Sequence, residues 1–129
     1  RFYFDRSPLY AEALHTNTSY LTAVANDYGY EQVFSRQIAA KGRRGDVLIG
    51  ISTSGNSPNV VLAMETAARI GLTRIAMTGQ SGGRMAALAD ILLAVPSTDT
   101  PRIQESHILL GHILCEAIEA TLFPPGSGR

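Results

Sequence analysis

The sequence has one cysteine, one lysine, no tryptophan and no long hydrophobic run. A lone cysteine, Cys115, excludes an internal disulfide framework and is typical of a reducing compartment. No run approaches the ~18 uninterrupted apolar residues of a membrane span, so we expect no membrane association. A basic-then-apolar leader is also missing, which favours a cytoplasmic protein. Eleven acidic residues balance eleven basic ones, which disfavours a nucleic-acid binder with a broad basic surface.

The length of 129 residues is that of one domain. A chain of this size buries about two-thirds of the surface of its unfolded form, so a hydrophobic core needs no disulfide or structural metal. We therefore expect a single domain over residues 1–123. Segment 124–129 is rich in proline and glycine and is predicted to be a flexible tail.

Short apolar runs alternate with segments of helical periodicity. The runs at 46–51, 73–78 and 91–95 lie between turn signals, a pattern typical of strands buried on both faces of a parallel sheet. Segment 11–15 is a weaker strand candidate. Helices are predicted at 30–40, 58–70, 83–90 and 102–123. This order indicates an α/β fold, a three-layer sandwich in which helices flank a central parallel sheet through right-handed crossovers.

Two predicted helices have informative ends or faces. Helix 58–70 has Ser57 as its N-cap, Pro58 at its first position and Gly71 just past its end. Helix 102–123 carries an apolar stripe that predicts its buried face. The stripe consists of Ile103, Leu110, Leu114, Ile118 and Leu122. Cys115, on the same helix, is expected to pack in the core.

The strongest signal for chemistry is the segment Ser52-Thr53-Ser54-Gly55-Asn56-Ser57, called the serine loop below. It joins a buried strand to a helix, which is where ligands bind in open α/β sheets. The helix N-terminus favours an anion, four hydroxyl groups add neutral donors, and Gly55 allows close approach of the backbone. The loop lacks the lysine of a P-loop and the three-glycine dinucleotide fingerprint. It therefore predicts a site for a phosphate monoester.

Other segments have ordinary structural explanations when spacing alone is considered. An N-cap and a polar turn would need only Ser57, but they leave three further hydroxyls unexplained. Asn26 and Asp27 lie where one helical pattern gives way to another, which a helix–helix turn explains. His107 and His112 are about 140° apart around a helix and do not form an i, i+4 metal pair, so spacing favours two core histidines. The glycine-rich segment 79–83 could flank a ligand or form a tight turn.

Taken together, the motifs resemble those of the bacterial phosphoheptose isomerase family of SIS (sugar isomerase) domains. They occur in the order Asn26-Asp27-Tyr28-Gly29-Tyr30, Gly45-Asp46-Val47-Leu48, the serine loop, Thr78-Gly79 with Gly82-Gly83, and Arg102-Ile103-Gln104-Glu105 with His112. The resemblance implies a flavodoxin-like, doubly wound SIS fold and a homotetramer. It also implies isomerisation of sedoheptulose 7-phosphate to D-glycero-D-manno-heptose 7-phosphate through an enediol. The product would feed lipopolysaccharide or related surface-glycan synthesis.

The resemblance also implies a role for individual residues. The sugar phosphate would be held by Ser52, Thr53, Ser54 and Ser57, and further substrate contacts would come from Asn26, Asp27 and Gln104. Zinc, one ion per subunit, would be bound by Gln104 and His112, and His112 is also a candidate catalytic proton shuttle. These implied roles replace the spacing-based interpretation of Asn26, Asp27 and His112, and they leave His107 in the core.

Part of the family's site has no match in this sequence. Its catalytic glutamate, a zinc-binding histidine and its N-terminal helical segment are expected upstream of Arg1. Gln104 and His112 are eight residues apart, about 12 Å along a straight helix and 80° around it. Both can reach one ion only through a helix bend, a later helix start or ligands from more than one subunit.

Two non-enzymatic readings of the sequence stay open. One is an adaptor of the same fold, like the SIS protein that binds the replication initiator, which needs no zinc site. The other is a sensor that binds sugar phosphate through the serine loop without turnover. An intact serine loop together with His112 favours the enzyme.

Overall fold

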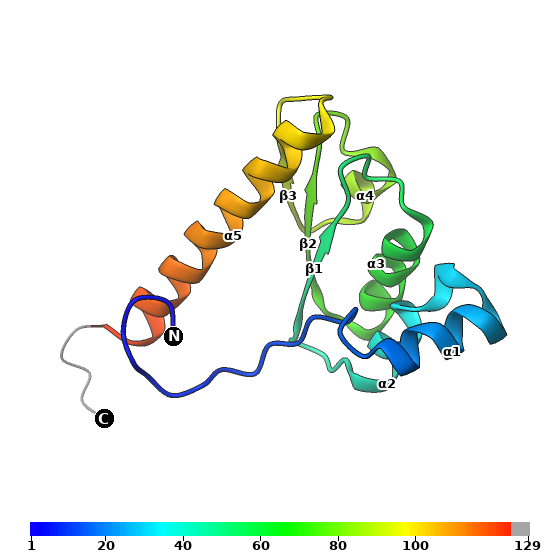
Figure 1. Ribbon diagram of the computed structural model, residues 1–129, viewed down its shortest axis with the longest axis horizontal. Coiled ribbons are helices and arrows are strands. Elements are labelled where there is room, and N and C mark those ends of the chain that lie inside the picture. Colours follow the sequence, from blue (N-terminus) through cyan, green and yellow to red (C-terminus); the bar gives the residue numbers. More distant parts are fainter. Residues whose placement is uncertain (125–129) are drawn as a thin grey trace.

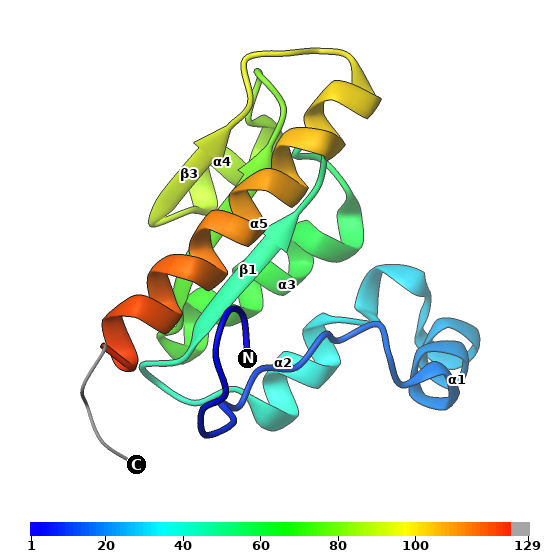
Figure 2. The same cartoon turned by 60° about the vertical axis from the view of Figure 1, so that its left-hand side comes forward.

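A computed structural model of the chain describes residues 1–124 and shows a three-stranded parallel sheet in the order β1-β2-β3. The strands are β1 Val47–Ile51, β2 Thr73–Thr78 and β3 Ile91–Ala94. They are joined by α3 Pro58–Ile70 and α4 Gly83–Leu88, and α5 Thr100–Leu122 follows the last strand. Helices α3 and α4 lie on one side of the sheet and α5 on the other (Figures 1 and 2), so the predicted three-layer α/β architecture is confirmed.

Three short elements precede the sheet. They are α1 Thr18–Tyr28, the 3-10 helix η1 Tyr30–Gln32 and α2 Ser35–Lys41. Gly29 ends α1 with a φ of 99°, so the predicted break after Asp27 is present. The single helix predicted for 30–40 is instead divided in two. The Ser35 hydroxyl donates to the carbonyl of Gln32 at 3.2 Å, one of the bonds that make the junction.

The weak strand predicted for 11–15 is wrong. This segment pairs with no strand and turns at Leu14 and His15. The carbonyl of Leu14 accepts a hydrogen bond of 2.7 Å from Gln37 Nε2, and Glu12 pairs with Lys41. Its polar groups therefore bind side chains of α2 instead of a neighbouring strand.

The core lies on the face of the sheet that α3 and α4 cover. One cluster joins α2 to α3 through Ile38, Ala63, Ala67 and Leu72. A second joins α3 and α4 to β2 through Val61, Met64, Ala76 and Met85. The predicted N-cap, first-turn proline and C-cap glycine of α3 are all in place, and Gly71 is left-handed with a φ of 89°. This packing holds the N-terminus of α3 against the end of β1.

The opposite face is much less covered, which corrects three predictions. Strands β1 and β3 are not buried on both faces as predicted: Val47, Ile49 and Ile51 of β1 are 45–57% exposed, and Ile91 and Leu92 of β3 are 49% and 41% exposed. On α5, Ile118 and Leu122 of the predicted stripe are exposed, whereas Ile103 is buried. Cys115 is exposed and not part of the core. The reason is geometric: α5 contacts β2 near its own beginning and then diverges from the sheet.

The predicted tail, 124–129, lies outside the described residues from position 125 onward. Among the residues described, none of the helices combines the length and hydropathy needed to cross a bilayer.

Candidate functional site

The carboxyl ends of all three strands meet at one edge of the sheet, at the top of Figure 1. The serine loop follows β1, segment 79–83 follows β2, and segment 95–99 follows β3. The Gly79 N–H donates to the carbonyl of Thr53 at 2.9 Å, and the Gln80 N–H donates to that of Ser97 at 3.1 Å. These backbone bonds fix the three loops relative to one another. The three loops thus form one continuous surface at the edge where open α/β sheets bind ligands.

Within the serine loop, the hydroxyl groups are directed toward one another. Ser52 Oγ lies 2.8 Å from Ser57 Oγ and 3.4 Å from Ser54 Oγ. Ser54 Oγ also accepts the N–H of Asn56 at 3.2 Å. Ser52 is buried at the base of this group. Hydroxyls that bond mainly to each other can rotate to donate to an anion, because each has a donor and two acceptor lone pairs.

The N-terminus of α3 is left open by this arrangement. Ser57 is the N-cap residue, as predicted, but its side chain makes no capping bond to the helix. Within residues 1–124, the Asn59 N–H has no hydrogen-bond partner, while the Val60 N–H is bound by the Asn59 side chain. An open first turn with its positive dipole end favours an anion at this position.

The glycines of the site bring two loops together. Gly55 has a φ of +66°, and a Cβ atom there would lie 2.1 Å from the carbonyl oxygen of Gly82. A Cβ atom on Gly83 would lie 2.5 Å from the carbonyl oxygen of Ser54. The sequence suggested that Gly55 admits a ligand, and the structure shows that it admits segment 79–83. The two loops therefore pack backbone against backbone.

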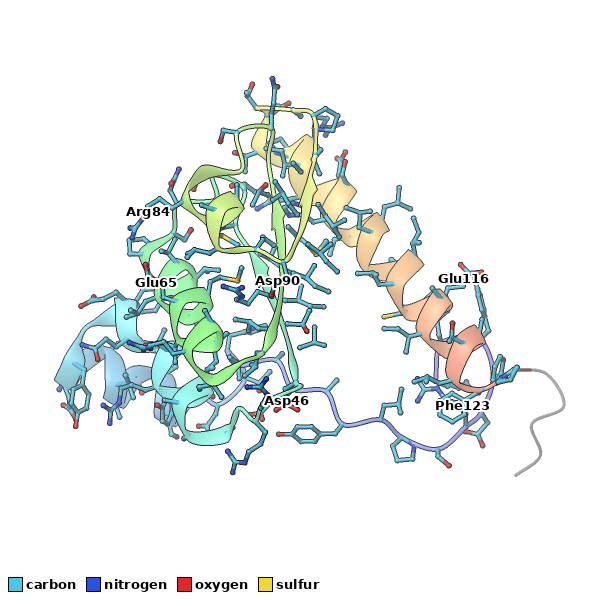
Figure 3. All side chains as sticks on the ribbon, turned by 180° about the vertical axis from the view of Figure 1, so that it is seen from behind. Asp46, Glu65, Arg84, Asp90, Glu116 and Phe123 are labelled. Carbon is cyan, nitrogen blue, oxygen red and sulfur yellow. The ribbon has the colours of Figure 1, made fainter. Side chains whose placement is uncertain are left out.

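Asn56 has a role that sequence reasoning missed. Its Oδ1 accepts the N–H of Arg84 at 2.9 Å, and the carbonyl of Gly55 accepts the N–H of Met85 at 3.0 Å. The serine loop thereby caps α4, whose own N-cap residue makes no side-chain cap bond. Figure 3 shows the Arg84 side chain directed toward Glu65 of α3, and the two groups are 3.4 Å apart.

A cavity of about 200 Å³ opens at this edge. It is lined by Thr53, Ser54, Gln80, Ser81, Ser97, Thr98, Thr100 and Ile103. None of these side chains is charged, and all but Ile103 can donate a hydrogen bond. Ser97, Thr98 and Thr100 were missed from the sequence, although they follow β3 as the serine loop follows β1. That shared position at a strand's carboxyl end was the available signal.

The other predicted site residues are not gathered around this cavity. Gln104 is exposed beside Ile103, which lines the cavity, whereas His112 is exposed farther along α5. Because α5 already begins at Thr100 and continues to Leu122, the helix does not start late, and the separation of about 12 Å stands. Asn26 and Asp27 share a 2.8 Å hydrogen bond in the last turn of α1, and neither lines the cavity.

The core position predicted for His107 is confirmed. Its side chain is buried, and Nε2 lies 3.1 Å from the carbonyl oxygen of Thr78. Because a carbonyl only accepts, Nε2 carries the hydrogen and Nδ1 is left without a partner. This bond ties α5 to the end of β2.

The described residues do not by themselves make a zinc centre. Among residues 1–124, no three or more His, Cys, Asp or Glu side chains are grouped so as to hold a metal ion. Gln104 and His112 offer an amide oxygen and an imidazole nitrogen, but a zinc site takes three or four protein ligands. Any complete site needs donors from outside this part of the chain.

Comparison with known proteins gives a consistent result. A family model described as a SIS domain matches residues 1–79. The chain is 55% identical over 126 residues to a phosphoheptose isomerase of Sulfurimonas denitrificans, covering 98% of this chain and 65% of that protein. It is 57% identical over 122 residues to one of Mycobacterium bovis, covering 95% of this chain and 62% of the relative. The chain thus spans less than two-thirds of these relatives.

Solved structures agree in fold. The phosphoheptose isomerase of Neisseria gonorrhoeae superimposes with a TM-score of 0.81 and 55% identity, over 83% of this chain and 61% of that one. The phosphoheptose isomerase of Francisella tularensis gives a TM-score of 0.84 and 44% identity, over 86% and 60% of the two chains.

Proposed function

Because the chain belongs to the SIS-domain family, we propose that it acts as an isomerase of sedoheptulose 7-phosphate. The product would be D-glycero-D-manno-heptose 7-phosphate, formed through an enediol and used for lipopolysaccharide or related surface-glycan synthesis in the cytoplasm. The support is the similarity to several phosphoheptose isomerases at 55–57% identity, together with the geometry of the serine loop.

The observation that carries the proposal is the open N-terminus of α3 beside four hydroxyl groups. The Ser52–Ser57 hydroxyl pair spans the loop, and neither group caps the helix. A phosphate dianion placed there would gain the helix dipole, the free N–H of Asn59 and the hydroxyls of the serine loop, which are those of Ser52, Thr53, Ser54 and Ser57. No lysine or arginine is needed, because hydrogen bonds to a charged acceptor are roughly twice as strong as neutral ones.

The remaining roles are proposed for the assembled protein. Isomerisation needs a base at carbon and a proton carrier at oxygen, and His112 is our candidate for the carrier. Gln104 adjoins the cavity and would contact the sugar, as would Asn26 and Asp27. We propose zinc as cofactor, one ion per subunit, with Gln104 and His112 among its ligands and the others from outside this sequence.

A homotetramer is part of the same proposal. Large apolar side chains are exposed along α5, including Ile108, Leu109 and Ile113, and others are exposed on β1. Apolar surface on two neighbouring elements is typical of an interaction site. Measurement of the molar mass in solution by light scattering tests this part separately.

The isomerase proposal is tested by incubating the full-length protein with sedoheptulose 7-phosphate and following the appearance of the aldose phosphate. We expect turnover that a chelator abolishes and zinc restores. His112→Ala should remove turnover, whereas His15→Ala, at another exposed histidine that makes no hydrogen bond or ring contact within the described residues, should leave it unchanged. Absence of aldose in the presence of zinc would exclude the isomerase.

A sugar-phosphate sensor is the second candidate. It is favoured by one observation: the serine loop lines a cavity in this chain, whereas His112 does not line it and lies farther along α5. A sensor would bind the sugar phosphate with no turnover, and His112→Ala would leave the affinity unchanged.

A further inference from the structure

The first residues of the chain are held at the far end of α5 by one carboxylate. Glu119 is 1% exposed, and its oxygens accept the N–H groups of Phe2 and Tyr3, both at 2.6 Å. They also accept the N–H of Phe4 at 3.4 Å and Nε of Arg6 at 3.0 Å. Successive backbone N–H groups of this kind form a concave anion-binding nest. Residues 2–6 with Glu119 are called the terminal clamp below.

The clamp also contains a cation–π contact. The Arg6 guanidinium lies over the ring of Phe123, 5.1 Å from its centroid. Figures 1 and 2 show the start of the chain as a loop close to the end of α5, and Figure 3 labels Phe123 there. Charged and aromatic contacts therefore join segments more than 110 residues apart in sequence.

Ionisation of the carboxylate is strongly favoured. Burial opposes the charge on Glu119, but hydrogen bonds from Tyr3, Phe2 and Arg6 outweigh it and lower the pKa to about 2. The carboxylate is thus charged at neutral pH, and its hydrogen bonds are of the strong, charge-assisted kind.

The clamp extends to His112. The ring of Phe2 lies 5.8 Å from the imidazole of His112, centroid to centroid, with the two planes tilted by 54°. His112 and Glu119 are seven residues apart, about two turns, so they lie on the same side of α5. Within the described residues this is the one ring contact of His112. Phe2 therefore links the two residues, because its N–H donates to Glu119 and its ring contacts His112.

We propose that Glu119 is a positioning residue: through the N–H of Phe2 it fixes the Phe2 ring against His112 and so sets the orientation of the imidazole. The proposal rests on the proposed function, in which His112 acts in isomerisation. Glu119 touches neither substrate nor reacting atoms, and its effect passes through Phe2. The positioning group is thus the carboxylate of Glu119, which lies two turns after His112 on the same side of α5.

The direct test is the NMR signal of the His112 ring in the 129-residue chain. Glu119→Gln keeps the size of the side chain but replaces one acceptor oxygen by an NH2 group. This group would face the backbone N–H groups of residues 2–4, which are also donors, so residues 2–4 should detach. We expect the His112 resonance to shift in Glu119→Gln and in the same direction in Phe2→Leu, with His15 unmoved. Glu116→Gln is the matched control, because Glu116 is exposed on the same helix and makes no hydrogen bond or ion pair within residues 1–124. An unshifted His112 signal in both variants would overturn the proposal.

Kinetics provide a second test that a purely structural role would not pass. A misplaced imidazole costs ten- to a hundredfold in kcat, so in the full-length protein Glu119→Gln should lower kcat by this factor and leave KM within about twofold. Glu119→Asp, which keeps the carboxylate, should recover part of the lost kcat. If Glu119→Gln fails to fold, Phe2→Leu provides the alternative test and should show the same fall in kcat. An equal fall in the activity of Glu116→Gln, or a change in KM alone, would contradict the assignment. If the wild type shows no turnover, the proposed function fails, and the NMR test still decides whether the clamp orients His112.

Discussion

The hydroxyl oxygens of Ser52 and Ser57 lie 2.8 Å apart, so the N-cap residue of α3 bonds across the serine loop and not to its own helix. Serine at an N-cap ordinarily accepts an N–H group of the first helical turn. Here the Ser57 side chain makes no such bond, and within residues 1–124 the Asn59 N–H of the first turn of α3 is left without a partner. The arrangement separates two roles that the sequence alone could not separate, helix capping and phosphate binding.

Ser57→Ala should weaken sugar-phosphate binding and leave the protein folded. A hydrogen bond to a charged group contributes about 1.5–3 kcal/mol, so the Kd should rise roughly ten- to a hundredfold. The free energy of unfolding should fall by no more than about 0.5–1.5 kcal/mol, because no capping bond is lost and Ser52 Oγ, which loses the bond to Ser57, keeps Ser54 Oγ as a neighbour at 3.4 Å. Calorimetric titration and urea unfolding measure the two quantities. Ser19→Ala, on exposed α1, is the control. Unchanged affinity for the sugar phosphate would mean that Ser57 has a structural role only.

Gly55→Ala should be far more costly than Gly45→Ala. Both glycines have positive φ, but a Cβ on Gly45 meets nothing within 4 Å, whereas one on Gly55 meets the backbone of Gly82. Gly45→Ala should thus cost only the left-handed strain of about 1–2 kcal/mol. Gly55→Ala adds a steric clash of about 1–3 kcal/mol, and it should also impair binding by moving segment 79–83. Equal losses of unfolding free energy in the two variants would contradict the observed packing of the loops.

Cys115 should react with a thiol reagent in the native protein as a single subunit. It is exposed on α5, contrary to the buried position expected from the sequence. Its reaction rate with a small disulfide reagent should therefore match that of the unfolded chain within about tenfold. Protection that is released only by denaturant would show that this part of α5 is covered in solution, for example in the proposed tetramer.

Acid should reveal the contribution of Glu119 to stability. Its pKa is lowered to about 2 from an ordinary value of 4.5, so its stabilising effect is complete above about pH 4.5 and is lost as the pH falls toward 2. The difference in Tm between wild type and Glu119→Gln should accordingly shrink over this range. Asp90, whose pKa is lowered mainly by a hydrogen bond from Arg74, contributes to both proteins alike. A difference in Tm that stays constant from pH 5 to 2 would contradict the ionised state assigned to Glu119.

Local signals predicted the elements that depend on neighbouring residues. The bounds of α3 and β2 agree with the prediction. The ends of α3 are marked by Ser57, Pro58 and Gly71, and β2 is marked by a short apolar run between turn signals. The serine loop was located for the same reason, since the change from strand to helix is visible in the sequence. Such features rest on contacts between residues close in the chain.

Features that depend on distant contacts could not be predicted. Nothing near Glu119 in the sequence indicates that the N–H groups of residues 2–4 bind it. From its neighbours in the sequence, Glu119 cannot be distinguished from an ordinary surface carboxylate. The apolar run of β1 predicted burial on both faces, but coverage of Val47, Ile49 and Ile51 depends on where α5 passes. The resemblance to SIS domains implies roles for Gln104 and His112 that stay predictions, because spacing on a helix could not supply them.

The most direct test of the account is the affinity of the protein for sedoheptulose 7-phosphate compared with sedoheptulose, measured by titration calorimetry for wild type and for Ser52→Ala with Ser57→Ala. If the serine loop binds the phosphate, the wild type should bind the phosphate ester much more tightly than the free sugar. The double variant should lose most of that difference while keeping its Tm. Equal binding of the two sugars by the wild type, or an undiminished preference for the ester in the double variant, would contradict the central claim.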